Sequence, residues 1–477
     1  MRQVTLSTIC LLLLYANAAG AEEPSLPPGL GGSEPSLPAG LGANEPALPA
    51  GLDDLPDKIP ANDTAAPDWK ESLPFDFTGY TETRLGTRLQ RDATQKTASM
   101  GEARLYLGAT KSWEGMTANL TGNFLYDPVL DRHNVELESG EGWFDLREAN
   151  LLFRPTDFSD IKVGRQILTW GTGDLVFIND LFPKDWNSFF IGRDEEYLKA
   201  PSDALKIALF HDIANLDIVY TPRFDSDRFI DGRRISYFNQ NAGNIVGRNM
   251  PVFVDKPSRW FDDDEIALRL YRMINTYETA LYYYGGYWKS PNGQDAVSVL
   301  FTFPVLSVYG VSMRGPLAGG IANAELGYYD SRDDSSGNNP LIRNSEWRLL
   351  VGYERELLSE FTGSVQYYLE RMENHDAYRA GLPAGVFAKD KNRHVVTVRL
   401  TKLLMNQNLI LSLFNFYSPS DKDGYIRPQI NYKLDDNWTL ETGGNLFFGK
   451  RNETFFGQFK DNSNVYVSVR YGFLRKL

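Results

Sequence analysis

The last strand-like stretch of the chain alternates apolar and polar residues without interruption. It reads VYVSVRYGF over residues 465–473. Side chains on a β-strand point to opposite faces with a period of two residues, so the three valines share one face with Tyr471 and Phe473. The opposite face carries Ser468 and Arg470. An apolar face that ends in aromatics suits lipid, and a face with an arginine suits water, so the stretch is typical of a membrane-spanning β-strand.

Runs of this kind recur from Phe75 to the end of the chain, and we count eighteen of them. The connections between them alternate between short ones, such as 212–213, and long polar ones, such as 224–263. One rim of an antiparallel membrane barrel carries short turns and the other long loops, and an even strand count returns both termini to one side. The sequence therefore predicts an all-β protein, a transmembrane antiparallel β-barrel of about 18 strands (16 to 20) over residues 74–477. The runs are 75–90, 99–113, 115–127, 142–154, 159–170, 203–211, 214–222, 264–274, 277–288, 298–314, 320–331, 345–356, 360–372, 393–405, 408–417, 424–434, 437–449 and 463–473.

The N-terminal residues have the features of an export signal. A short basic start is followed by a mostly apolar stretch over 4–15 and by an A-x-A cleavage motif at 19–21. These features predict a signal peptide over residues 1–21 and a mature chain that begins at Glu22. The single cysteine, Cys10, lies within the signal, so we expect the exported chain to hold no disulfide and no thiolate metal ligand.

Residues 22–73 differ in composition from the rest of the chain. They are rich in proline and contain three copies of an 11-residue repeat, which begin at Glu23, Glu34 and Glu45. Dense proline removes backbone donors and favours extended geometry, so the segment is predicted to be a disordered periplasmic tail. The simpler interpretation is a spacer. The alternative is that residues 22–60 dock a periplasmic protein partner, because closely spaced copies suit multivalent binding.

Composition excludes several classes of protein. Mean hydropathy is −0.36, and no run of 18 apolar residues follows the signal, which excludes helical membrane spans. A net charge of −13 argues against nucleic acid as a partner. A chain with 13% aromatic residues, 41 glycines and one cysteine is typical of an exported β protein in a Gram-negative outer membrane, where the lipid is its first expected partner.

The face of each run opposite the apolar one is expected to line the interior, because a charged side chain facing lipid costs about 2–4 kcal/mol near the bilayer midplane. A barrel of this width is not filled by its own side chains, so the interior should hold water. Basic residues predominate among the predicted lining residues, which favours anionic solutes. The alternative is that arginines and glutamates pair and brace the wall. The predicted pore-lining residues are Glu82, Arg84, Arg88, Glu102, Arg104, Lys206, Arg269, Arg348, Glu354, Glu370, Arg399, Arg427, Lys433, Glu441 and Arg470.

The connection between the fifth and sixth runs is far more apolar than the other loops. Its residues 174–191 include four phenylalanines and a tryptophan. Apolar surface of that size is buried in a stable protein, and the inside wall of the barrel is the available place. We therefore predict an inward-folded constriction, with an external cap packed on other loops as the alternative. Its predicted solute-facing residues are Asp174, Asp180, Lys184, Asp185, Trp186, Arg193, Asp194, Glu195 and Glu196.

A short motif at the end of the fifth run resembles a strand-end motif of Gram-negative outer-membrane porin families, including the alginate-export and anion-selective porin-like barrels. It consists of Val163-Gly164-Arg165-Gln166 followed by Trp170-Gly171. The resemblance implies a porin-like barrel over residues 75–477, and general porins also fold a loop inward after the fifth strand. Simple alternation would place Arg165 on the lipid side, so Gly164 is expected to mark a bulge that redirects it.

The sequence lacks the patterns of a catalytic or cofactor site. The four histidines have no second ligand at metal-binding spacing, and no haem, phosphate-loop or G-x-S-x-G motif occurs. We therefore expect no cofactor, no metal and no enzyme activity. The first hypothesis is a channel for a small polar, anionic or saccharide-like solute; the others are a scaffold barrel that docks a periplasmic partner through its tail, and a barrel hydrolase.

Overall fold

The computed structural model describes residues 75–130 and 132–474. The expected signal peptide (1–21) and proline-rich tail (22–73) lie outside the described residues, as do the repeats, for which docking of a periplasmic partner was the alternative to a spacer. The fold below is that of the predicted barrel region.

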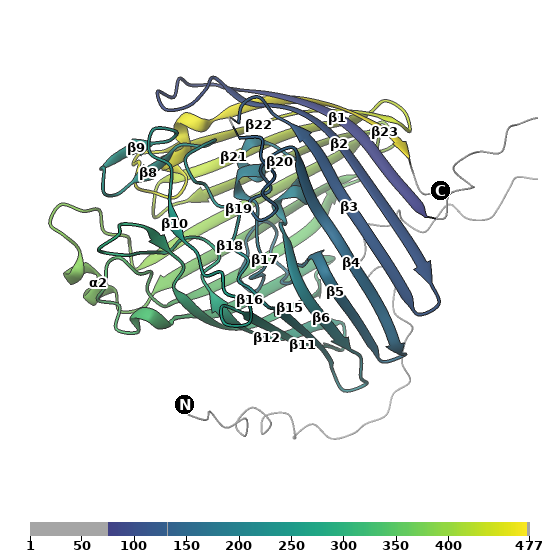
Figure 1. The fold of residues 1–477 in the computed structure, drawn as a ribbon, viewed down its shortest axis with the longest axis horizontal. Coiled ribbons are helices and arrows are strands. Elements are labelled where there is room, and N and C mark those ends of the chain that lie inside the picture. The colour runs from purple at the N-terminus through teal and green to yellow at the C-terminus, as the bar shows by residue number, and fades with distance from the viewer. Residues whose placement is uncertain (1–74, 131, 475–477) are drawn as a thin grey trace, which may run out of the picture. The chain divides into compact units, whose positions relative to one another are not determined.

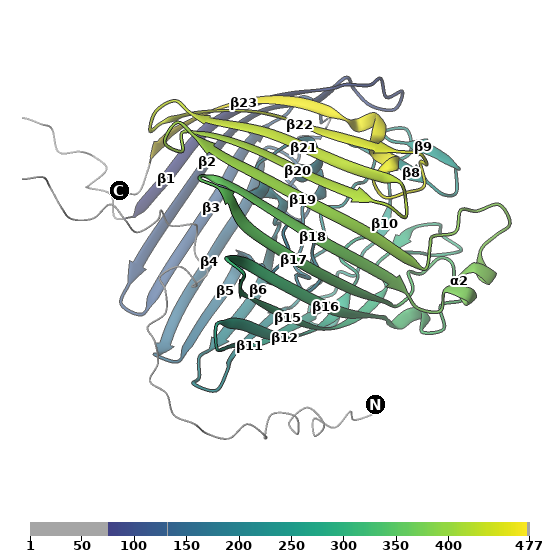
Figure 2. The ribbon, with the colours of Figure 1, turned by 180° about the vertical axis from the view of Figure 1, so that it is seen from behind.

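Eighteen antiparallel strands form a closed β-barrel (Figure 1; Figure 2). Each strand pairs with its neighbour in the chain, and the first pairs with the last, so that Glu82 lies opposite Arg470 and Leu85 opposite Val467. The predicted fold class and strand count are therefore confirmed. The barrel strands are β1 (Asp76–Arg88), β2 (Ala98–Trp113), β3 (Met116–Tyr126), β4 (Phe144–Thr156), β5 (Ser159–Ile167), β6 (Pro201–Leu209), β7 (Asn215–Thr221), β11 (Glu265–Ile274), β12 (Tyr277–Tyr287), β15 (Val305–Leu317), β16 (Gly320–Ser331), β17 (Glu346–Leu358), β18 (Phe361–Met372), β19 (Asn392–Leu404), β20 (Leu409–Ser418), β21 (Asp423–Lys433), β22 (Trp438–Gly449) and β23 (Asn464–Leu474).

The alternation that predicts the strands also decides which side chains face out. In β23 the side chains of Val465, Val467 and Val469 are 39–54% exposed on the outer face, whereas Tyr466 and Ser468 are buried on the inner face. A closed barrel has no open edge, so every strand finds a partner on both sides. The outer surface is therefore apolar, as a bilayer requires.

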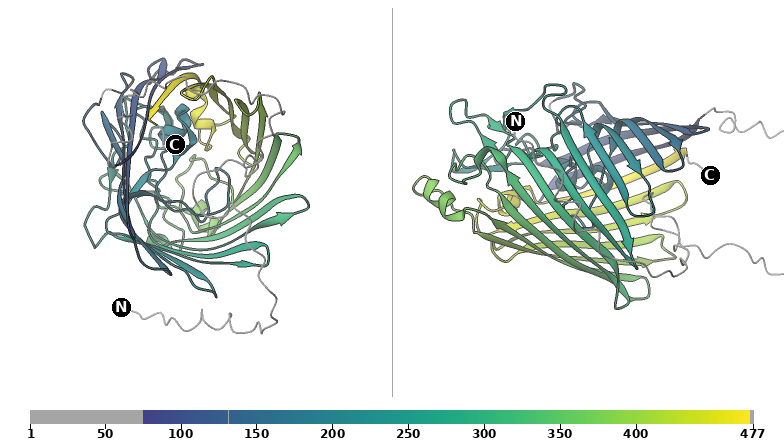
Figure 3. Two further views of the ribbon diagram at one scale, coloured as in Figure 1. Left: turned by 90° about the vertical axis from the view of Figure 1, so that its right-hand side faces the viewer. Right: turned by 90° about the horizontal axis from the view of Figure 1, so that it is seen from below.

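The two rims of the barrel differ in the length of their connections. On one rim the strands join through short turns, as between β2 and β3 or between β11 and β12. The other rim carries the long loops, including 168–200 and 222–264, and the short helix α2 (His375–Gly381) (Figure 3). The long-loop rim also holds small sheets formed by β8 (Tyr237–Asn239) with β9 (Asn244–Val246), and by β10 (Val254–Asp255), β14 (Phe301–Thr302) and β13 (Gly293–Gln294).

One barrel strand begins later than the sequence predicted. The run expected at 298–314 enters the barrel only at Val305, the first residue of β15. Pro304 has no backbone N–H to donate to a strand ladder. The residues before it, Phe301–Thr302, pair instead as β14 in the separate three-stranded sheet.

The expected bulge at Gly164 is absent from both pairings of that residue. Gly164 does have a positive φ of 113°, but Arg165 stays directly opposite Asp203 and forms an ion pair of 3.1 Å with it. The Nε of Arg165 also donates to the carbonyl oxygen of Leu146 at 2.7 Å. Arg165 is therefore kept from lipid by polar partners near the long-loop rim, without a shift of register.

Candidate functional site

Residues 168–200, which we call the inner loop, connect β5 and β6 and lie inside the barrel (Figure 3, left). Hydrogen bonds and ion pairs join this loop to inward-facing side chains of β1, β2, β4, β16, β18, β19, β21 and β23. These strands lie on different sides of the ring, so the inner loop crosses the lumen.

A short helix, α1 (Trp186–Ile191), forms the middle of the inner loop. Asp185 begins it, because its carboxylate accepts a hydrogen bond from the backbone N–H of Ser188 at 2.7 Å. Gly192 ends it with φ 94°, a left-handed conformation that favours glycine. A Cβ on Gly192 would lie 2.3 Å from the ring of Tyr466 on β23, so glycine also allows the helix to approach the wall.

Aromatic packing holds α1 against the wall. Phe189, Phe190 and Ile191 are each at most 3% exposed. The ring of Phe190 packs edge-on against Tyr425 and Phe447 on the neighbouring strands β21 and β22, with centroids 5.6 and 5.2 Å apart. The apolar side chains of Phe189, Phe190 and Ile191 are thus buried inside the barrel, as the apolar composition of the loop predicts.

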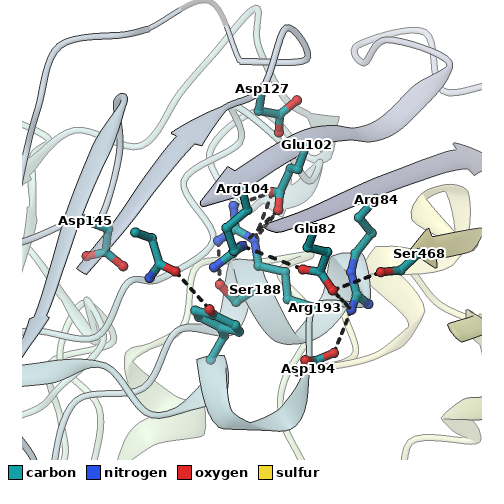
Figure 4. Close-up of polar contacts among 12 residues, drawn as sticks. Glu82, Arg84, Glu102, Arg104, Asp127, Asp145, Ser188, Arg193, Asp194 and Ser468 are labelled. Carbon is teal, nitrogen blue, oxygen red and sulfur yellow. Dashed lines mark hydrogen bonds and ion pairs between the residues drawn. The ribbon is translucent and has the colours of Figure 1, made fainter. Parts of the chain in front are cut away.

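Asp194 joins the inner loop to the two strands that close the barrel (Figure 4). Its carboxylate lies 2.6 Å from the guanidinium of Arg84 on β1 and forms a second ion pair with Arg470 on β23. Arg84 also contacts Glu441 on β22 at 2.9 Å. One loop carboxylate therefore bridges both sides of the β1–β23 closure.

A second ion-pair group on β1 and β2 holds Arg193. Its guanidinium donates to Glu102 at 2.9 Å, and Glu102 also accepts from Arg104 at 3.1 Å (Figure 4). Arg104 lies directly opposite Glu82 in the register, with 3.8 Å between the charged groups. The predicted pairing of these glutamates and arginines is present, but it also includes the inner loop.

The other end of the inner loop is attached to β16. Glu325 on that strand accepts hydrogen bonds from the backbone N–H of Gly173 at 2.9 Å and from the side-chain amide of Asn179 at 2.9 Å. It also accepts from Thr172, through the hydroxyl group at 3.0 Å. Because its side chain is buried, Glu325 fixes this part of the loop rather than attracting a solute.

Arg399 on β19 receives two carboxylates of the inner loop. Asp174 lies 2.7 Å from its Nε and 2.9 Å from its Nη2, and Glu195 lies 3.2 Å from the same Nη2. Glu195 also lies 3.4 Å from Arg427 on β21. The acidic residues of the loop therefore offset basic residues of the wall.

The environment moves the pKa values of the loop residues Asp194 and Asp174 in opposite directions. Burial alone would raise the pKa of Asp194, but Arg84 and Arg470 hold it well below its usual range. Burial raises the pKa of Asp174, although Arg399 opposes the change. Asp194 is thus the more firmly ionised of the two.

A neighbouring loop supports the inner loop from the long-loop rim. Arg228, in the loop between β7 and β11, forms ion pairs with Asp145 on β4 at 2.8 Å and with Asp185 at 3.3 Å. The indole N–H of Trp186 donates to Asp227 at 3.1 Å. Within the inner loop, Lys184 pairs with Asp180 at 2.9 Å, and both are buried.

Most other predicted lining residues also have protein partners. Arg88 donates to the carbonyl oxygen of Ala98 at 3.0 Å, and Lys433 pairs with Asp436 in a turn on the opposite rim. The remaining pairs are Lys206 with Asp217, Arg269 with Glu278, Arg348 with Glu346, and Glu370 with Arg343. A role of these residues in lining a solute path stays a prediction.

An open cavity of about 230 Å³ remains on the inner face of β17, β18 and β19. It lies where Arg399 meets the inner loop, and the predicted lining residue Glu354 contributes its side chain. The other lining residues are Thr362, Ser364, Thr401 and Leu403.

Several residues that hold the site together were missed in the sequence. Glu325 lies between the outward-facing Ala324 and Leu326, so the alternation rule that identified the other lining residues could have found it. Arg228 carries no such signal, because it lies in a long loop without periodicity. Its role depends on how two loops pack.

No protein-family model matches the chain, and no curated protein matches it. Its structure does match solved structures. Acinetobacter baumannii OccAB4 is 11% identical, with 84% of this chain and 98% of that chain covered and a TM-score of 0.51. Pseudomonas aeruginosa OccK5 (OpdH) is 9% identical, with 84% of this chain and 98% of that chain covered and a TM-score of 0.49. A triple mutant of Rhodopseudomonas blastica porin is also 9% identical, with 84% of this chain and 100% of that chain covered and a TM-score of 0.37.

The fold is that of the outer-membrane porins. An apolar outer surface on a closed barrel of this kind places the chain in the outer membrane, as the sequence predicted. No helix within 75–130 or 132–474 is long and apolar enough to cross a membrane. In the same described ranges, no group of three or more histidine, cysteine, aspartate or glutamate side chains is arranged to hold a metal ion.

Proposed function

We propose that this protein is a porin-like channel whose inner loop limits the passage of small polar solutes. The observation that carries the proposal is the path of the inner loop, which is attached by Asp194 to the β1–β23 closure and by Asp174 to β19. A barrel of eighteen strands is wider than its wall side chains can fill. A loop fixed at several points across it therefore controls the free cross-section.

The channel would then select solutes by their size and by their polar contacts with the lumen, without a covalent step. Of the fifteen predicted lining residues, ten are basic, which by itself would favour anions. Residues 174–196 of the inner loop add six acidic and two basic side chains, and several of the acids pair with wall arginines. The net charge of the predicted lining residues and that of the loop residues are therefore almost equal and opposite. Of the two expected solute classes, the neutral, saccharide-like one is supported better than the anionic one.

Removal of residues 174–196 tests the constriction. We expect the single-channel conductance of the deletion variant in planar bilayers to rise severalfold, because the obstruction in the lumen is removed. Removal of the exposed residues 384–386 from the loop between β18 and β19 is the matched control and should leave conductance unchanged. Both variants are first checked for a folded barrel by heat-modifiable migration in gels. An unchanged conductance of a folded 174–196 deletion would refute the constriction role.

A further inference from the structure

Four of the polar side chains that line the cavity on the inner face of β17–β19 lack protein partners among the described residues. Within the part of the chain that the structure describes, no hydrogen bond or ion pair engages the carboxylate of Glu354 or the hydroxyls of Thr362, Ser364 and Thr401. The Nη1 of Arg399 is also without a protein partner there, whereas its Nε and Nη2 are held by the inner loop.

The free groups form an ordered row across three strands. Glu354 lies directly opposite Ser364, and Ser364 lies directly opposite Arg399. Side chains paired in this way are about 4.5–5.5 Å apart at Cβ, so an acceptor, a hydroxyl and a donor follow one another over about 10 Å. Thr362 and Thr401 lie opposite each other and add two hydroxyls one row away.

This chemistry matches a ligand that both donates and accepts hydrogen bonds along its length. A carboxylate accepts two hydroxyl donors, and a guanidinium N–H donates to a hydroxyl oxygen. The side chain of Leu403 supplies an apolar surface at one side. Adjacent hydroxyl groups on a sugar ring present the required donors and acceptors together.

The charges at the cavity argue against an ionic ligand. The positive charge of Arg399 is offset by Asp174 and Glu195, so an anion gains little there. A cation that approached Glu354 would meet the guanidinium of Arg399 two strands away. The volume of about 230 Å³ is below the range of roughly 300–1,000 Å³ that drug-sized ligands occupy, which suits a single ring.

We propose that this cavity is a binding subsite for one unit of a neutral polyhydroxylated solute, a monosaccharide or a sugar residue of that size, with Glu354 as its main acceptor. The proposal rests on the channel function above and names the class of solute. It also assigns a specificity role to Ser364, Thr362 and Thr401.

The test is the interruption of ion current through single channels in planar bilayers by a neutral hexose. Glucose at millimolar concentrations should cause resolved closures of the wild-type channel. Glu354→Gln should raise the apparent dissociation constant about fivefold to tenfold, since a hydrogen bond to a charged acceptor is replaced by one to a neutral acceptor. Ser364→Ala should weaken binding less, because it removes one neutral partner.

Glu148→Gln is the matched control for charge. Glu148 is also on the barrel wall, on β4, where it pairs with Lys162 at 3.6 Å, so this change removes the same charge away from the cavity. It should leave the response to glucose unchanged. Glucosamine, which carries an ammonium group at neutral pH, is the second probe and should block the wild-type channel no better than glucose.

A conducting channel without glucose closures would overturn the subsite and leave the channel function standing. Closures by glucosamine alone would show a cation site and also reject the proposal. Equal loss of glucose binding in Glu354→Gln and Glu148→Gln would show an effect of total lumen charge and likewise reject it. Absence of any ion current in folded protein would reject the channel function itself.

Discussion

Gly192 ends α1 with a backbone conformation that other residues adopt only at a cost. Its φ is 94°, and an added Cβ would meet the ring of Tyr466 at 2.3 Å. Gly243, in the turn between β8 and β9, has a similar positive φ of 65° but no atom within 4 Å of such a Cβ. The two glycines therefore separate the cost of backbone strain from the cost of crowding.

Gly192→Ala is expected to lower the free energy of unfolding by about 2–5 kcal/mol. Backbone strain contributes about 1–2 kcal/mol, and displacement of the Tyr466 ring about 1–3 kcal/mol more. Gly243→Ala, the control, should cost only the strain. Unfolding in urea, followed by tryptophan fluorescence in detergent micelles, measures both. Equal losses for the two variants would contradict the close packing of α1 against β23.

At the scale of elements, the inner loop is both a constituent of the lumen and a support of the wall. Asp194 bridges Arg84 on β1 and Arg470 on β23, the two strands whose pairing closes the barrel. Asp174 makes a comparable pair with Arg399, but on β19 alone. The two carboxylates thus attach the same loop to different parts of the wall, and only one of them spans the closure.

We expect Asp194→Asn to destabilise the barrel by about 1–3 kcal/mol, because the buried guanidinium of Arg84 and the half-buried one of Arg470 lose an ionised partner. The pKa of Asp194 lies below its usual range, so its contribution is present at neutral pH and is lost only as the pH falls below the ordinary aspartate range. Asp174→Asn should cost clearly less. The temperature at which the folded band disappears in gels measures both variants at pH 7. Equal shifts would show that the closure gains nothing specific from Asp194.

At the scale of the whole molecule, the predicted lining residues of the wall are mainly basic and the inner loop is mainly acidic. Some basic residues of the wall pair with wall acids, such as Arg348 with Glu346, whereas Arg399 and Arg427 pair with acids of the single segment between β5 and β6. Ion selectivity is therefore a property of the assembled interior, since neither set of charges acts alone.

The double variant Asp174→Asn and Glu195→Gln is expected to shift ion selectivity towards anions, because Arg399 and Arg427 lose the carboxylates that offset them. The reversal potential in a potassium chloride gradient measures the shift, and the wild-type value should lie close to zero. Glu114→Gln, in the exposed turn between β2 and β3, is the control and should not change it. An unchanged potential, or a shift towards cations, would disprove the balance of charges.

The sequence by itself determined the strands, because the period of two is a local property. Val465, Val467 and Val469 share one face of β23 whichever strands it pairs with, and in the barrel that face is the outer one. The lengths of the turns and loops can also be read from the sequence. The same rule placed Glu82, Arg84 and Glu102 on the inner face. The start of β15 was predicted too early, because the apolar residues 298–303 look like strand but precede Pro304 and pair elsewhere.

Only the tertiary structure decided which of these inward charges are free. Asp194 reaches Arg84 and Arg470 across separations of 110 and 276 residues, and no periodicity records that meeting. Glu354 has the same place in the alternation as its neighbours on β17, yet it faces an open cavity while Glu346 is paired. The physical reason is that alternation assigns a side chain to a face, whereas the path of the inner loop across the closed barrel selects its partner.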